Sequence, residues 1–128
     1  MNVVIDASAL LALLQQEPGA ERVAEALVGG AMSVANLAEV AAKQVDLGLD
    51  ASVLVDRVEA LGIRTFPVTR EDVATQARIR RLDVGGRLGL SLGDRLCLAL
   101  GLRLDVPVMT ADRVWAGLDL PIEVELIR

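Results

Sequence analysis

Four carboxylates in this sequence lie beside apolar segments, where a charged group needs a partner. Asp6 ends the run VVI, Glu39 lies in SVANLAEV, Asp94 in LSLGDRLCLAL and Asp112 in VMTAD. Removing a carboxylate from water without a partner costs several kcal/mol, roughly. Each acid therefore requires a helix N-terminus, a cation or a metal ion, and their wide spacing means that only the fold could bring all four together.

A cluster of these four acids could not ionise fully without a cation, because each carboxylate raises the pKa of its neighbours. The chain has no histidine and a single cysteine, Cys97, which its apolar surroundings mark as a buried residue. Ligands that are all oxygen favour Mg²⁺ or Mn²⁺. A divalent ion held by carboxylates can activate water and stabilise a leaving oxygen, so the four acids predict metal-dependent phosphodiester hydrolysis.

Each acid also has a structural interpretation on its own. The segments Asn36 to Glu39 and Ser91 to Asp94 both resemble capping boxes, in which an acid in the first turn stabilises the start of a helix. Asp6 and Asp112 could cap short helices that follow them. The set as a whole favours metal binding, because no lysine or histidine lies nearby to neutralise four carboxylates.

Smaller polar and basic residues could support the same chemistry. Ser8 and Thr110 could hydrogen-bond a ligating carboxylate or the scissile phosphate, or could instead cap local backbone. The densest basic stretch, RIRRLDVGGR, is either a rim that contacts phosphates or a solvated helix face. Its arginines, the candidate phosphate-contacting residues, are Arg78, Arg80, Arg81 and Arg87.

The elements that must position these residues alternate along the chain. Strands are expected at 2–5, 31–34, 63–68 and 106–109, with a possible edge strand at 122–126. Helices are expected at 7–16, 20–28, 36–47, 51–61, 70–82 and 92–104, with a glycine-rich loop at 84–90 and a helical turn at 112–117. Such alternation predicts an α/β fold with a mainly parallel sheet, and ligands bind such sheets at the carboxyl ends of the strands. All four acids map to that edge.

Composition limits the possible functions. The 128 residues, 53% of them hydrophobic, predict one domain spanning 1–128. No apolar run is long enough to span a membrane and no signal peptide is evident, so a cytoplasmic protein is expected. The net charge of −5 means that an acidic substrate such as a nucleic acid needs a bridging cation. The Leu- and Ala-rich segments 7–14 and 20–28 suggest more apolar surface than a monomer covers, hence a dimer or a bound partner.

The four motifs VVIDAS, SVANLAEVAA, LSLGDRLCLAL and VMTADRVW, in this order, resemble those of PIN-domain ribonucleases, and most closely those of the small VapC-type toxins. The resemblance covers nearly the whole chain. It implies a three-layer α/β/α sandwich with a sheet of four to five strands, and RNA cleavage dependent on Mg²⁺ or Mn²⁺. By this resemblance Asp6, Glu39, Asp94 and Asp112 are the metal-binding and catalytic acids. It also implies a homodimer and inhibition by a VapB-type antitoxin, whose tail could place an arginine among the carboxylates.

Two other functions remain open from the residues alone. A phosphatase or phosphotransferase with an aspartyl nucleophile would also use an aspartate at a strand end. Such a site generally needs a second aspartate nearby and a strand-end lysine, whereas Ser8 stands two residues after Asp6 and Lys43 lies within a helix segment. A catalytically silent interaction module with the same fold is the other alternative, and four intact acids argue against it.

Overall fold

A parallel β-sheet organises the computed structural model, which describes all of residues 1–128. The strand order is β3-β2-β1-β4-β5, and every neighbouring pair is parallel. The strands are β1 (Val3–Ile5), β2 (Gly30–Ser33), β3 (Arg64–Phe66), β4 (Val108–Thr110) and β5 (Val124–Leu126). The predicted α/β class is therefore confirmed, and the segment expected as an edge strand does form one edge of the sheet.

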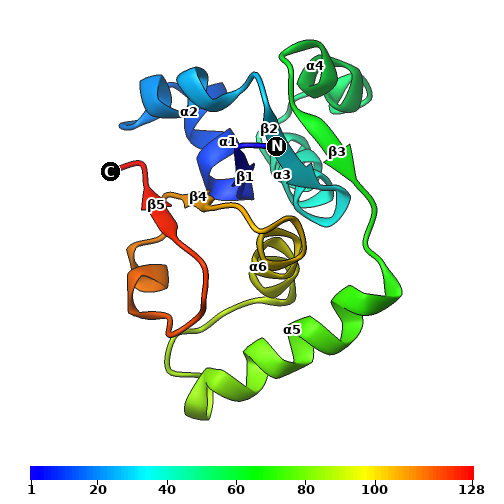
Figure 1. The fold of residues 1–128 in the computed structure, drawn as a ribbon. Coiled ribbons are helices and arrows are strands. Elements are labelled where there is room, and N and C mark those ends of the chain that lie inside the picture. The colour runs from blue at the N-terminus through cyan, green and yellow to red at the C-terminus, as the bar shows by residue number, and fades with distance from the viewer.

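Helices cover both faces of this sheet, as in a three-layer sandwich. They are α1 (Ala7–Leu14), α2 (Ala20–Ala26), α3 (Val34–Asp46), α4 (Leu54–Ala60), α5 (Arg70–Leu82) and α6 (Leu92–Leu104), with 3₁₀ turns η1 (Val84–Gly86) and η2 (Arg113–Gly117). In Figure 1, α6 lies between α5 and the strands, while α1 to α4 gather around the other side.

The central strand β1 explains why an apolar run precedes Asp6. Successive side chains of a strand point to opposite faces. Val3 and Ile5 join the core cluster under α1 to α4, whereas Val4 joins the cluster beneath α6. All three residues are buried, so β1 is covered on both faces, as is typical of a central parallel strand.

Helices α5 and α6 begin at capping boxes and match their expected bounds. Thr69 and Ser91 are the N-caps, and each exchanges hydrogen bonds with the aspartate three residues later, Asp72 and Asp94 respectively. These bonds lie within four residues of sequence, which is why local patterns locate both helices.

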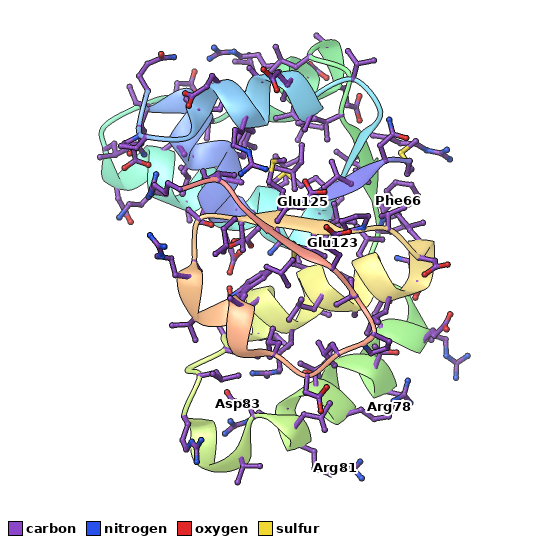
Figure 2. All side chains as sticks on the ribbon, turned by 60° about the vertical axis from the view of Figure 1, so that its left-hand side comes forward. Phe66, Arg78, Arg81, Asp83, Glu123 and Glu125 are labelled. Carbon is purple, nitrogen blue, oxygen red and sulfur yellow. The ribbon has the colours of Figure 1, made fainter.

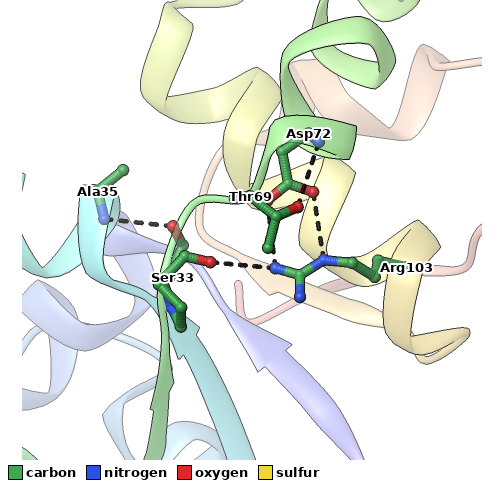
Figure 3. Close-up of polar contacts among 6 residues, drawn as sticks. Ser33, Ala35, Thr69, Asp72 and Arg103 are labelled. Atoms are coloured by element: carbon green, nitrogen blue, oxygen red, sulfur yellow. Dashed lines mark hydrogen bonds and ion pairs between the residues drawn. The ribbon is translucent and has the colours of Figure 1, made fainter.

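Helix α3 starts earlier than the sequence suggests. Its N-cap is Ser33, whose hydroxyl accepts from the backbone N–H of Ala35 (Figure 3). Asn36 is therefore inside the first turn, and Glu39 lies in the second turn of the helix. The prediction that Asn36 and Glu39 form a capping box is wrong, because the helix begins at Val34, two residues before Asn36.

An ion pair fixes α5 against α6 (Figure 3). The guanidinium of Arg103 donates to both carboxylate oxygens of Asp72, at 3.3 and 3.2 Å, and to the carbonyl of Pro67 at 3.2 Å. Asp72 lies in the first turn of α5 and Arg103 in the last turn of α6. The two helices therefore run in opposite directions, and the basic end of α5 lies toward the start of α6.

Several exposed apolar side chains lie on or beside α3 and α4. Helix α1 packs against both α2 and α3, and its leucines are buried or half-buried, so the segment 7–14 leaves little apolar surface fully exposed. In the segment 20–28, Val28 is exposed. A groove between α3 and α4 is lined entirely by apolar residues, including Val34 and Val55. None of the helices combines the length and the apolar character needed to cross a membrane. Large apolar side chains exposed on or beside α3 and α4 are Val34, Val45, Leu47, Leu49, Val53 and Val55.

Candidate active site

Asp6 is the buried centre of the acidic edge. It follows β1 and precedes α1, but its side chain does not cap that helix. Its Oδ2 atom accepts hydrogen bonds from Ser8 Oγ at 2.7 Å and from Thr110 Oγ1 at 2.9 Å. Ser8 and Thr110 thus fix one carboxylate oxygen, and the other, Oδ1, accepts no side-chain hydrogen bond.

The two hydroxyl groups also connect β1 to the end of β4. Ser8 Oγ and Thr110 Oγ1 lie 3.2 Å apart, and Ser8 Oγ accepts from the backbone N–H of Ala111 at 3.0 Å. Thr110 Oγ1 accepts from the N–H of Asp112 at 3.1 Å. Asp6 and Asp112 are therefore held in a defined relation by residues that are more than a hundred positions apart in the sequence.

Burial gives Asp6 an unusual protonation equilibrium. Desolvation raises its pKa from 3.8 to about 6, and the negative charge of Asp94 adds to the shift. The hydrogen bonds from Ser8 and Thr110 act in the opposite direction, because they favour the ionised form. Burial of Asp94 likewise raises its pKa, with a smaller contribution from the charge of Asp112. The charges of neighbouring acids thus add to the effect of burial at both Asp6 and Asp94.

Glu39 reaches the same region from the exposed side of α3. Its Oε2 atom accepts a hydrogen bond of 3.0 Å from Asn36 Nδ2, and its carboxylate lies against Gly93, the residue before Asp94. Burial raises the pKa of the Cys97 thiol, and the charges of Asp6, Asp94 and Glu39 raise it further. These three acids therefore all lie near Cys97. The fold therefore brings the acids, from four separate segments, to one edge of the sheet.

Two of the acids also cap helices. Asp94 Oδ2 accepts from the N–H of Ser91 at 2.9 Å, and Asp112 Oδ1 accepts from the N–H of Val114 at 3.0 Å. The capping interpretation thus describes both residues, yet each bond occupies a single oxygen and leaves the other available. Capping and metal ligation are compatible at these two positions.

A divalent cation fits the chemistry of this site but requires side-chain adjustment. No three acidic or cysteine side chains converge closely enough to hold a metal ion as they stand. Asp94 and Asp112 each give one oxygen to a bond that caps a helix. The buried Asp6 has no cationic partner, and a cation would relieve the cost of ionising it. Glu39 is exposed and Asp94 and Asp112 are half-buried, so these three acids are the other candidate oxygen donors at this edge.

The candidate basic residues occupy the end of α5 and the loop after it. Arg78, Arg80 and Arg81 are exposed on α5, and Figure 2 shows Arg78 and Arg81 directed away from the sheet. Arg87 is exposed in the loop that leads to α6. Arg95 has a structural role that the sequence did not indicate, because it donates to Gln76 and to the carbonyl of Leu90 and so fixes this loop.

Comparison with known proteins identifies the fold. The chain belongs to the PIN-domain family, whose family model matches residues 3–119. A search of curated protein sequences gives no significant match.

Solved structures share this fold over nearly their whole length. A chain of a toxin-antitoxin complex from Klebsiella pneumoniae has a TM-score of 0.71 and 17% identity, with 95% of this chain and 99% of that chain covered. A chain of DNA-bound VapBC from Salmonella typhimurium has a TM-score of 0.72 and 12% identity, covering 100% and 99%. A chain of FitAcB from Neisseria gonorrhoeae has a TM-score of 0.64 and 21% identity, covering 98% and 97%. The fold is thus the one found in these complexes.

Proposed function

We propose that this protein is a Mg²⁺- or Mn²⁺-dependent endoribonuclease that acts through Asp6, Glu39, Asp94 and Asp112. PIN domains are generally nucleases, which gives the reaction class. The observation that carries the proposal is the buried Asp6 carboxylate, which has a raised pKa, no cationic partner and other acids beside it. An arrangement so costly for a stable core is typical of functional sites.

Some of these residues would hold the cation, and others would orient the groups around it. Asp6 would hold the cation, while Ser8 and Thr110 donate to its Oδ2 atom and favour the ionised form. Asp94, Asp112 and Glu39 supply the remaining protein oxygens or orient the attacking water. A bound divalent ion would lower the pKa of that water and stabilise the charge that develops on the scissile phosphate.

Substrate RNA approaches an acidic protein, so local positive charge must position it. The arginines at the end of α5 and in the following loop are suited to contact phosphates, because they are exposed and lie toward the α6 end that carries Asp94. They are Arg78, Arg80, Arg81 and Arg87.

An antitoxin partner is part of this proposal. The structural neighbours include complexes named as toxin-antitoxin or VapBC assemblies. We infer that this chain is likewise the VapC-like toxin of a VapB-paired system, acts in the cytoplasm and forms a homodimer. The exposed apolar residues of α3 and α4 supply surface for such contacts. An arginine from the antitoxin would neutralise the acids by charge-assisted hydrogen bonds.

Cleavage of a mixed RNA pool tests the proposal. Purified wild-type protein is incubated with Mg²⁺ or Mn²⁺, with a chelator control, beside Asp6→Asn and Asp94→Asn. Asp105→Asn is the matched control, because Asp105 is exposed and precedes β4 at the opposite edge of the sheet. We expect metal-dependent cuts in the wild type and in Asp105→Asn, and their loss in the other two variants.

Three other results would contradict the nuclease assignment. Equal cleavage by all four proteins would identify a contaminating nuclease. Silence of a folded wild-type protein toward RNA, together with hydrolysis of a phosphomonoester that requires Asp6, would favour the aspartyl-nucleophile alternative. Silence toward both substrates would favour the interaction module.

A further inference from the structure

We propose that Asn36 and Gly93 together position the Glu39 carboxylate, so that this exposed acid can serve the metal site. The inference rests on the proposed function, since it assigns a role to residues that support one of the four acids. Asn36 would act through Glu39 and is a positioning residue.

The amide of Asn36 connects two helices at the acidic edge. Its Nδ2 atom donates to Glu39 Oε2 and to the backbone carbonyl of Gly93, both at 3.0 Å. Asn36 itself has no exposed surface, although Glu39 is exposed. Both N–H groups of the amide are thus used, one to hold the carboxylate and one to hold the start of α6.

The absence of a side chain at Gly93 makes room for this arrangement. A Cβ atom added to Gly93 would overlap the Glu39 carboxylate. The backbone of Gly93 does not have the positive φ that would itself require glycine. Glycine also weakens a helix relative to alanine. Glycine at this position therefore leaves the space that the Glu39 carboxylate occupies, and a larger residue would require Glu39 to move.

The other side of the Asn36 amide argues against a purely structural role. Its Oδ1 atom is buried and has no hydrogen-bond partner. An orphaned acceptor of this kind is costly, and leucine has a similar shape without it. Asn36 therefore contributes less to the stability of the core than leucine would. Its bond to Glu39 instead restricts the rotation of a long, exposed side chain.

Titration with Mn²⁺, followed by the electron paramagnetic resonance signal of the free ion, tests the inference without relying on activity. The proteins are the wild type, Asn36→Leu, Gly93→Ala, Glu39→Gln and the double variant Asn36→Leu with Glu39→Gln. Gly117→Ala is the matched glycine control, because Gly117 has open space around it and no positive φ. Thermal unfolding of each protein verifies that it is folded.

We expect Asn36→Leu and Gly93→Ala each to weaken Mn²⁺ binding about tenfold, as is common when a residue that supports a metal ligand is lost. Gly117→Ala should bind like the wild type. In the Glu39→Gln background, Asn36→Leu should change the affinity less than about twofold, because the carboxylate through which Asn36 acts is already gone.

Three results would overturn the inference in distinguishable ways. Wild-type affinity in either Gly93→Ala or Asn36→Leu would show that Glu39 needs no such support. An equal loss with and without the Glu39 carboxylate would assign Asn36 a general structural role. A wild-type protein that binds no Mn²⁺ would overturn the proposed function itself, and the inference with it. If Asn36→Leu did not fold, Gly93→Ala alone would decide, since alanine favours the helix.

Discussion

At the scale of single residues, the Asp6 side chain is held in place by hydrogen bonds, although its burial disfavours the ionised form. Two hydroxyl groups hold one of its oxygens, yet burial raises its pKa to about 6. The folded protein therefore binds a proton at Asp6 more tightly than the unfolded chain does. A site that must capture a cation has an advantage in such a group, because the cation replaces the proton as its partner.

This raised pKa predicts the pH dependence of stability in the presence of a chelator. Because the folded state binds the proton more tightly, the Asp6 contribution to stability falls as the pH rises from about 4 to about 6. A shift of this size corresponds to about 3 kcal/mol. Asp6→Asn removes the buried charge, so its stability relative to the wild type should increase by about this amount between pH 4 and pH 7.5. Urea unfolding at both pH values measures the difference.

Asp105→Asn provides the comparison for that experiment. Asp105 is exposed, so the same chemical change there should leave the pH dependence of the wild type intact. A constant difference between Asp6→Asn and the wild type at the two pH values would refute the effect of burial.

At the scale of elements, the contact between α5 and α6 places the basic residues relative to the acids. Arg103 bonds both oxygens of the buried Asp72, which also caps α5. Because the two helices run in opposite directions, this contact near one end orients the other end, where α5 leads into the loop before Asp94. Arg95 reinforces that end through Gln76.

Loss of this ion pair should destabilise the protein. Arg103→Met keeps much of the apolar stem but leaves the Asp72 carboxylate buried without its charged donor. Hydrogen bonds to charged groups contribute about 1.5 to 3 kcal/mol, so we expect a loss of about 2 kcal/mol in urea unfolding. Arg78→Met is the control, because Arg78 is exposed and bonds only Thr75, and it should change stability by less than about 0.5 kcal/mol. Equal effects of the two changes would mean that the pair contributes nothing specific.

At the scale of the whole molecule, charge is distributed unevenly. The net charge is −5, yet the end of α5 and the following loop carry Arg78, Arg80, Arg81 and Arg87. A polyanion is repelled by the protein as a whole and attracted locally. Binding of RNA should therefore depend strongly on this end of the molecule and on salt.

The salt dependence of RNA binding tests this distribution. In the Asp6→Asn background, which the proposed function predicts to be inactive, a triple change of Arg80, Arg81 and Arg87 to glutamine should weaken binding to single-stranded RNA. If each contacts one phosphate, the slope of log K against log salt should fall in magnitude by about 2. A triple change of the exposed Arg57, Arg64 and Arg70 is the control of equal charge. The same slope in both triple variants would mean that only net charge matters.

The apolar residues of α3 and α4 predict association. We expect the wild type to be a dimer in light scattering at micromolar concentration, because an apolar groove of this kind favours contact with a second apolar surface. Val55→Glu should shift the protein to the monomer. Val28→Glu changes an exposed valine outside that groove and should leave the dimer intact. A monomeric wild type would contradict the expected dimer.

Local patterns in the sequence predict much of this fold and the candidate acids. The bounds of α5 and α6 follow from capping boxes whose hydrogen bonds span three residues. The apolar run before Asp6 predicts a buried strand, since burial on both faces removes the alternation of polar side chains. The rule that ligands bind at the carboxyl ends of parallel strands then selects the acids.

Other features depend on contacts between distant segments, which no local pattern contains. The bond from Asn36 to Gly93 joins residues 57 positions apart, and the bond from Thr110 to Asp6 joins residues 104 apart. The raised pKa of Asp6 arises from the desolvation imposed by the surrounding core. The sequence by itself thus determined the elements and the acidic edge, because these follow from short-range hydrogen bonding and hydrophobic periodicity. Only the tertiary structure decided how each acid is held, because packing brings its partners from elsewhere in the chain.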